Sequence, residues 1–207
     1  MNENILSEVS NYYSSKVVLH GATSQGVDWN GEDSQYQRFY QLSKVFLDVE
    51  KPEASFSLLD LGCGYGAYLD FLKSLSHSVD YIGVDISESM IVHAKGKYPN
   101  HTFLSSLDSN RKVDYAIASG VFNVRQEVGD EEWLQYIYDT LDQMNSVATK
   151  GFAFNVLTSF SDEEYKRDYL YYANPMVLFA HCKQCYSKDV ALLHDYQLYE
   201  FTIIVRK

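Results

Sequence analysis

The stretch SLLDLGCGYGAYLDFL, residues 57–72, places three glycines within five positions, between an apolar run and a predicted helix. Glycine weakens the interior of a strand or helix, so Gly62, Gly64 and Gly66 indicate a turn that a ligand can approach closely. The helix that follows directs its unpaired N–H groups and the positive end of its dipole towards this turn. We therefore expect a strand at residues 56–61 whose following turn suits a carboxylate or phosphate group.

Asp85 ends the next predicted strand, DYIGVD, residues 80–85. In open α/β sheets the ligand lies beyond the carboxyl ends of the strands, so this carboxylate should lie close to the glycine turn. An aspartate in that place accepts hydrogen bonds from both hydroxyls of a ribose. The turn and Asp85 together predict a site for a nucleoside-containing cofactor.

Short apolar runs alternate with amphipathic stretches from residue 55 to residue 158. This alternation indicates crossover connections, and hence a parallel sheet with helices on both faces. We expect strands at residues 56–61, 80–85, 101–106, 113–122 and 151–158, and helices at residues 67–76, 87–98 and 130–144. The pattern is that of an α/β domain with a doubly wound sheet.

The C-terminal part departs from this alternation. Residues 163–186 are predicted to form helical pieces that are interrupted at Pro175. Residues 188–197 and 199–207 are two strand-like runs with no helix between them. Such a pair forms an antiparallel hairpin, which we expect at one edge of the sheet.

The run LLDLGCGYG, residues 58–66, resembles the signature of the class I S-adenosylmethionine-dependent methyltransferases. That signature is an acidic residue, one further residue and then G-x-G-x-G, and the acidic position here is Asp60. A dinucleotide-binding fold would instead favour G-x-G-x-x-G near the start of the chain, whereas here Ala67 takes the place of the last glycine. The resemblance extends over residues 55–207, and it implies a Rossmann-like, mostly parallel seven-stranded sheet and S-adenosyl-L-methionine as the cofactor.

The resemblance also implies which residues contact the cofactor. Asp60 would fix the glycine turn or meet the amino group, Asp85 would hold the ribose, and Met90 would cover the adenine unless it only packs in the core. The family often has F-x-x-G-D after the third strand, but FLSSLD, residues 103–108, leaves the adenine edge to Ser106 or, after a local shift, to Asp108. The implied set is Asp60, Gly62, Cys63, Gly64, Tyr65, Gly66, Asp85, Ile86, Met90, Ser106, Leu107, Ser119, Gly120, Phe122, Trp29 and Arg38.

The first 50 residues are predicted to be mostly helical, with a glycine-bearing loop that contains Trp29. Similar small-molecule enzymes carry such helices as a lid, so we interpret residues 1–50 as a lid segment and residues 51–207 as the cofactor-binding domain. On this interpretation Trp29 forms a wall of the pocket, and Arg38 pairs with the carboxylate of the cofactor or with an anionic substrate. The alternative is that Trp29 and Phe39 only dock the helices.

Methyl transfer from a sulfonium is an in-line displacement, so the enzyme mainly aligns donor and acceptor. An alcohol or ammonium acceptor must also lose a proton, and histidine is the first candidate base. The candidates are His20 in the lid segment and His181 near YYANP, residues 171–175. Asn123, after the predicted fourth strand, either approaches the acceptor or is an ordinary loop or helix-cap residue.

Composition restricts the partners. The 17 basic and 28 acidic residues give a formal net charge of −11, which repels a nucleic-acid backbone. No apolar stretch is long enough for a membrane span and no secretory signal is present, so we expect a cytoplasmic protein, a monomer or homodimer, that binds no membrane. The cysteines Cys63, Cys182 and Cys185 favour a reducing compartment and ordinary packing over a metal site.

The predicted function is S-adenosylmethionine-dependent methyltransfer to the oxygen or nitrogen of a small molecule. Arg38 and Arg125 favour an anionic acceptor, whereas the acidic net charge favours a neutral or cationic one. One alternative is a catalytically silent module that binds the cofactor. Another is an aminopropyl transferase, which would need an acidic pair where the chain has GVFNV, residues 120–124.

Overall fold

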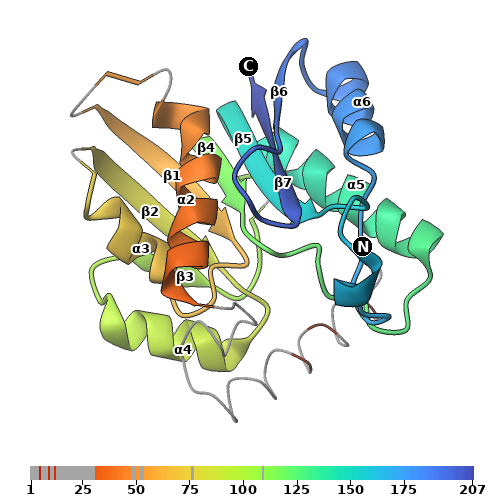
Figure 1. Ribbon diagram of the computed structural model, residues 1–207. Helices are drawn as coiled ribbons and strands as arrows, with labels where there is room; N and C mark the ends of the chain where they lie inside the picture. Colours follow the sequence, from red (N-terminus) through yellow and green to blue (C-terminus); the bar gives the residue numbers. More distant parts are fainter. Residues whose placement is uncertain are drawn as a thin grey trace.

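A seven-stranded sheet forms the centre of the protein in the computed structural model, which describes residues 5, 9, 12, 31–47, 50–51, 54–75, 77–108 and 110–207. The strand order is β3-β2-β1-β4-β5-β7-β6 (Figure 1). The elements are α2 (Glu32–Leu47), β1 (Ser55–Leu61), α3 (Ala67–Leu72), β2 (Ser78–Val84), α4 (Glu88–Lys97), β3 (Thr102–Leu104), β4 (Val113–Ala118), α5 (Asp130–Val147), β5 (Ala148–Leu157), the 3-10 helix η2 (Glu163–Tyr165), α6 (Pro175–Cys185), β6 (Asp189–Leu193) and β7 (Glu200–Arg206).

The first five strands run parallel, and β7 is antiparallel to both β5 and β6. This confirms the prediction of a doubly wound, mostly parallel α/β sheet with a C-terminal antiparallel hairpin. The hairpin lies at the edge of the sheet, with β6 outermost. The helix predicted at residues 67–76 is shorter than expected, because α3 ends at Leu72 and turns follow it.

The prediction for residues 163–186 was wrong at Pro175. This proline begins α6 and does not interrupt it, since the first position of a helix needs no N–H donor. The side chain of Asn174 caps the helix by accepting a hydrogen bond of 2.9 Å from the backbone N–H of Met176. The residues before this cap form η2 and a loop, and no α-helix lies between β5 and α6 in this fully described stretch.

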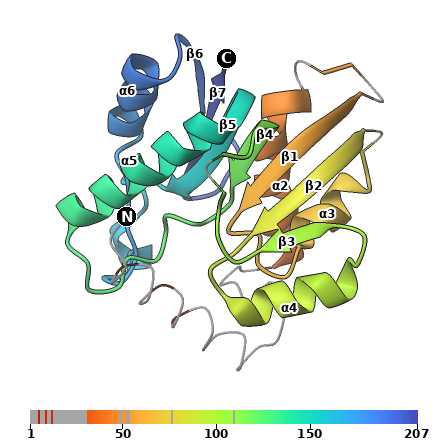
Figure 2. The same cartoon turned by 180° about the vertical axis from the view of Figure 1, so that it is seen from behind.

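Helices cover both faces of the sheet, as the two opposite views show (Figures 1 and 2). Helices α2, α3 and α4 pack on one face, in a core that includes Phe46, Leu58 and Ala94. Helices α5 and α6 pack on the other face, in a core that includes Trp133 and Phe154. The central strands are apolar because both of their faces are buried.

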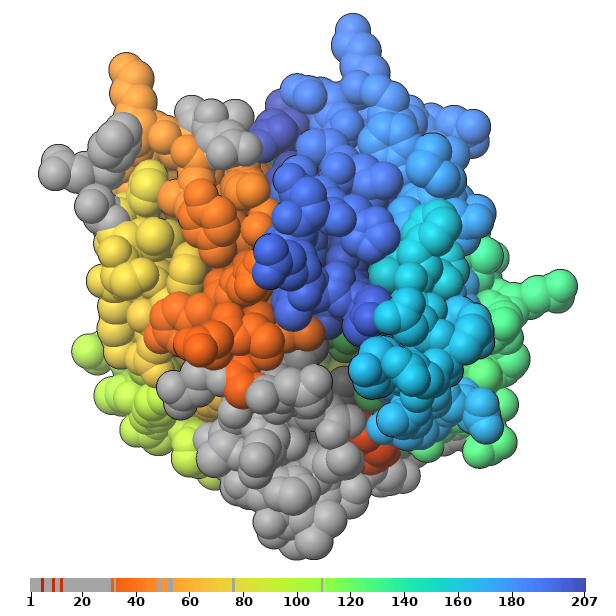
Figure 3. Space-filling view, viewed as in Figure 1, coloured from red at the N-terminus to blue at the C-terminus, as the bar shows by residue number. Residues whose placement is uncertain are grey.

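Helix α2 is part of this layered body. Leu42, Val45 and Phe46 are fully buried against the sheet, and α2 contacts both β5 and β7. In the space-filling view α2 lies directly against the segment that joins β6 to β7, where the side-chain amide of Gln37 donates a hydrogen bond to the carbonyl of Tyr196 (Figure 3). The lid role of residues 1–50 stays a prediction, since most residues before Gly31 lie outside the described part of the chain.

Gly151 in β5 tests the pairing of β5 with the C-terminal hairpin. A Cβ at this position would lie 2.5 Å from the backbone oxygen of Val205 in β7. We expect Gly151→Ala to lower the free energy of unfolding by about 1–3 kcal/mol, because the strands must separate to admit the methyl group. Urea denaturation measures this change.

Gly96 in α4 gives the matched control for this substitution. It is exposed, and a Cβ there would meet no atom within 4 Å. Gly96→Ala should raise the free energy of unfolding by about 0.5–1 kcal/mol, because alanine is the better helix former. Equal effects of the two substitutions would show that the contact between β5 and β7 is not as tight as described.

Candidate functional site

The carboxyl ends of three parallel strands meet at one edge of the sheet. Leu61 at the end of β1 is paired with Val84 of β2 on one side and with Ala118 of β4 on the other. The turns that follow these three residues therefore leave the sheet side by side. They surround a cavity of about 330 Å³, which is in the size range of small-molecule sites.

The glycine turn requires glycine for two reasons. The φ angles of Gly62, Gly64 and Gly66 are 74°, 54° and 84°, all in the left-handed region that other residues rarely adopt. In addition, a Cβ on Gly62 would lie 2.5 Å from Cγ2 of Val121. The bare backbone is therefore fixed by conformation and packing, and it lines the cavity.

Asp85 holds this turn against the end of β2. Its Oδ2 accepts a hydrogen bond of 2.8 Å from the N–H of Gly64, and its Oδ1 accepts one of 2.8 Å from the N–H of Ser87. Burial raises the pKa of the Asp85 carboxyl, and the two backbone donors oppose this effect. The same carboxylate lines the cavity, so it can contact a ligand while it also fixes the glycine turn.

Asp60 lies beneath the turn, at the end of β1. It is buried, and its Oδ2 accepts a hydrogen bond of 2.7 Å from the hydroxyl of Tyr81. Burial raises the pKa of Asp60 to about 7, and the nearby charge of Asp85 adds to the increase. A cation in the cavity would favour the ionised form of this carboxyl, because opposite charges stabilise each other.

Most of the predicted cofactor contacts converge on the cavity. The lining includes Asp60, Gly62, Cys63, Gly64, Tyr65, Asp85, Ile86, Met90, Ser106, Leu107, Ser119 and Gly120. Among them, the hydroxyl oxygen of Ser119 is buried and has no hydrogen-bond partner among the described residues. Gly66 does not line the cavity but starts α3, with its backbone packed against Tyr98.

Phe122 and Asn123 follow β4 but do not line the cavity. Phe122 is fully buried in the core, 5.7 Å from Phe154 between ring centroids. The side-chain oxygen of Asn123 accepts a hydrogen bond of 3.1 Å from the backbone N–H of Leu157. This contact is the one expected of an ordinary loop residue, the second of the two alternatives for Asn123. His20 and Trp29 lie outside the described residues.

Arg38 and His181 have partners away from the cavity. The Nε of Arg38 donates to both carboxylate oxygens of Glu200, at 2.8 and 2.9 Å, so the structure gives it an internal partner where we expected an anion of the ligand. The ring of His181 stacks on Tyr138 with 3.9 Å between centroids, and burial lowers its pKa. The structure does not bring either residue to the cavity lining.

Asp108 is also absent from the lining. Its Oδ1 accepts a hydrogen bond of 3.0 Å from the backbone N–H of Asn110, within its own loop. The neighbouring Ser105, Ser106 and Leu107 do line the cavity. Of the two residues expected at the adenine edge, Ser106 therefore lies at the cavity and Asp108 does not.

Sequence reasoning missed one wall of the cavity, which α5 supplies. Tyr136, Thr140 and Gln143 line it, and their spacing places them on one helix face, a signal that the sequence contains. On α2, Gln35 also lines the cavity, and its side-chain oxygen accepts a hydrogen bond of 3.4 Å from the hydroxyl of Tyr65. Further lining residues that we did not predict are Val9, Phe39, Leu61, Ala67, Tyr68, Val84, Ser105 and Val121.

Comparisons with known proteins identify the family. The family described as a methyltransferase domain matches residues 59–147. The protein "Putative methyltransferase Rv1506c" of Mycobacterium tuberculosis is 51% identical over 155 residues, which are 73% of this chain and 93% of that protein. The chain belongs to the class I S-adenosylmethionine-dependent methyltransferases, and S-adenosylmethionine is its cofactor.

Solved structures agree with this fold. Magnesium protoporphyrin IX methyltransferase from Synechocystis PCC 6803, with bound SAH, has a TM-score of 0.68 and 16% identity, and the match covers 97% of this chain and 99% of that one. The DhpI–SAM–HEP complex has a TM-score of 0.67 and 14% identity, with 100% of both chains covered. At sequence identities this low, the two structures show similarity in fold alone.

The residues around the cavity fit this cofactor. They offer a bare glycine backbone, a half-buried carboxylate at Asp85 and the hydroxyl of Ser119, which has no hydrogen-bond partner among the described residues. No group of three or more His, Cys, Asp or Glu side chains in the described residues could hold a metal ion. Within the same residues, none of the helices has the length and apolar character that crossing a membrane requires.

Asp60 makes stability depend on pH. Its pKa is about 7 in the folded protein against an ordinary value of 3.8, so the folded state keeps a proton that the unfolded chain has lost. The contribution of Asp60 to the free energy of unfolding should therefore be highest below pH 3.8 and fall as the pH rises to about 7. The raised pKa of Asp85 acts in the same direction. The loss is roughly 1.4 kcal/mol for each unit of pKa difference.

The variant Asp60→Asn should lose this contribution, because its amide oxygen can still accept from Tyr81 but no longer titrates, so the difference in stability between parent and variant should change between pH 3.8 and about 7. Denaturant unfolding of the cofactor-free protein at several pH values measures both slopes. Equal slopes in the parent and the variant would show that Asp60 titrates normally.

Proposed function

We propose that the protein transfers a methyl group from S-adenosylmethionine, bound in this cavity, to a neutral or cationic small molecule. The observation that carries the donor site is the convergence of the glycine turn and the Asp85 carboxylate on one cavity. The methionine part would lie against the backbone of Gly62 and Gly64, and Asp85 would accept from the ribose hydroxyls. Ile86, Met90 and Leu107 would enclose the adenine.

Bound S-adenosylmethionine supplies an electrophilic methyl group on a positively charged sulfur. The protein's own part is to align this group with the acceptor and to exclude water. The turn after β4, with Ser119 and Gly120, forms the cavity wall next to the glycine turn, so we assign the reacting end of the cofactor to this wall. The buried Asp60 lies beneath the glycine turn, where it would meet the cationic amino group of the methionine part.

The described charges favour a neutral or cationic acceptor. Arg38 is paired with Glu200, and the Nε of Arg125 lies 3.5 Å from Asp130. The guanidinium of Arg125 also donates to the carbonyl of Val128 at 2.7 Å. Both arginines that favoured an anionic acceptor therefore have partners within the protein. The described lining contains two aspartates and no lysine, arginine or histidine.

The small-molecule class has support from one structural neighbour, which is named for magnesium protoporphyrin IX. We propose oxygen or nitrogen as the methylated atom. No histidine of the described residues lines the cavity, so His20 stays the candidate base for an acceptor that must lose a proton. An amine that is already neutral would need alignment alone.

The ribose contact can be tested with Asp85→Ala. The variant loses two charge-assisted hydrogen bonds to the ribose, and we expect binding of S-adenosylhomocysteine to weaken by about 2–4 kcal/mol in isothermal calorimetry. Asp80→Ala is the matched control, because Asp80 is an exposed aspartate of the same strand. Equal affinity of the Asp85 variant and the parent would exclude Asp85 as the ribose contact.

The acceptor class can be tested with tritium-labelled S-adenosylmethionine. The protein is incubated with the labelled cofactor and with separated low-mass, protein and nucleic-acid fractions of a cell extract. We expect label in the low-mass fraction, because the cavity has the size of a small-molecule site and the acidic net charge repels a polyanion. Label only in RNA, DNA or protein would contradict the small-molecule proposal, and a protein that binds no cofactor when titrated would contradict the donor site.

A further inference from the structure

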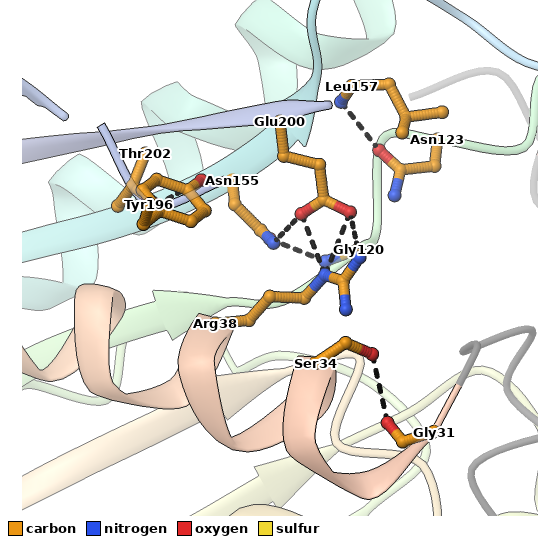
Figure 4. Close-up of polar contacts among 10 residues, drawn as sticks. All are labelled: Gly31, Ser34, Arg38, Gly120, Asn123, Asn155, Leu157, Tyr196, Glu200 and Thr202. Carbon is orange, nitrogen blue, oxygen red and sulfur yellow. Dashed lines mark hydrogen bonds and ion pairs between the residues drawn. The ribbon is translucent and has the colours of Figure 1, made fainter. Parts of the chain in front are cut away.

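A buried chain of polar contacts runs from α2 through the sheet to the cavity wall (Figure 4). Arg38 donates from Nε and Nη2 to the carboxylate of Glu200, at 2.5 to 2.9 Å. The side-chain amide of Asn155 in β5 donates to Oε2 of Glu200 at 2.7 Å, and its oxygen accepts from the N–H of Gly120 at 2.8 Å. The exposed fraction of these residues is 8% for Arg38, 1% for Glu200 and 0% for Asn155.

The direction of every hydrogen bond in this chain is fixed by chemistry. A guanidinium only donates and a carboxylate only accepts. Asn155 must therefore present its NH2 group to Glu200, and this leaves its oxygen for the N–H of Gly120. The opposite orientation of the amide would place two acceptors together and two donors together, so the charge of Glu200 selects one orientation.

The orientation of Asn155 in turn fixes the peptide between Ser119 and Gly120. No peptide bond of the described residues is cis, so the carbonyl and the N–H of this peptide point in opposite directions. Its N–H is turned into the sheet, towards Asn155. The carbonyl oxygen of Ser119 is therefore turned away from Asn155, on a segment whose two residues line the cavity.

We propose that Glu200 and Asn155 are positioning residues that hold the Ser119 carbonyl towards the positively charged sulfur of the methyl donor. The partial negative charge of a carbonyl oxygen attracts a sulfonium cation and has no comparable attraction for the neutral sulfur of the demethylated product. Arg38 stabilises the buried carboxylate of Glu200 by pairing with it. Without this partner, the buried negative charge would strongly destabilise the folded protein. This inference rests on the proposed binding of S-adenosylmethionine in the cavity.

The role predicts selectivity between two ligands that differ in the charge on sulfur. Asn155→Leu keeps the side-chain volume close to that of asparagine, keeps the Arg38–Glu200 pair and removes both amide contacts. We expect the dissociation constant for S-adenosylmethionine to rise about tenfold and that for S-adenosylhomocysteine by no more than about twofold in isothermal calorimetry. A role in stability alone would change both constants alike.

Thr202 provides the matched control. It is fully buried on β7, two residues after Glu200, and its hydroxyl lies 3.0 Å from the hydroxyl of Tyr196, away from the cavity lining (Figure 4). Thr202→Val removes a buried polar contact of the same strand, and the ratio of the two dissociation constants should stay at the parent value. An unchanged ratio in Asn155→Leu overturns the proposal, whatever happens to stability.

Two further results separate the possible failures. A parent protein that binds neither ligand contradicts the proposed function, whereas a parent that binds both, with an unchanged ratio in the variant, contradicts the positioning role alone. If Asn155→Leu does not fold, hydrogen exchange of the parent protein tests the hydrogen bond between Gly120 and Asn155 on which the proposal depends. The amide of Gly120 should be strongly protected without ligand, because it donates to a buried oxygen. Exchange at the rate of an exposed peptide overturns the proposal.

Discussion

The parallel register of β1, β2 and β4 is the constraint on which the site depends. Because Val84, Leu61 and Ala118 lie in one row, everything that follows these residues leaves the sheet at the same edge. A slip of one residue in any of the three strands would turn its side chains to the opposite face of the sheet. It would also separate the glycine turn from Asp85. The tightly packed strands thus position a site built mostly from turns.

Three carboxyl groups near this edge, two of them buried and that of Asp85 half-buried, are stabilised in different ways. Asp85 accepts from two backbone N–H groups, Glu200 is paired with Arg38, and Asp60 accepts from the neutral hydroxyl of Tyr81. The pKa of Asp60 is accordingly the one raised to about 7. The cavity therefore has acidic groups and no described basic group in its lining, a distribution suited to a ligand with positive charges.

The sequence allowed prediction of the sheet, its hairpin and about half of the residues that line the cavity, because strand rhythm, glycine conformations and the acid after β2 are local signals. It did not reveal the partner of Arg38, because that contact depends on how α2 packs across β7. One signal was available: Asn155 in FAFNVL and Glu200 in EFTIIV are polar residues within apolar strands. Such residues must find partners inside the protein, but the pattern alone does not identify them.

The pairing of Arg38 with Glu200 also bears on how the chain acquires its structure. The two residues are 162 positions apart, so their contact closes one of the longest loops that the fold contains. During synthesis, α2 leaves the ribosome long before β7 exists, and contacts of such high sequence separation form late and slowly. A partly made chain can assemble β1 to β4 and still lack the ion pair. Helix α2 can therefore complete its contacts with the sheet only after the C-terminal hairpin has paired with β5.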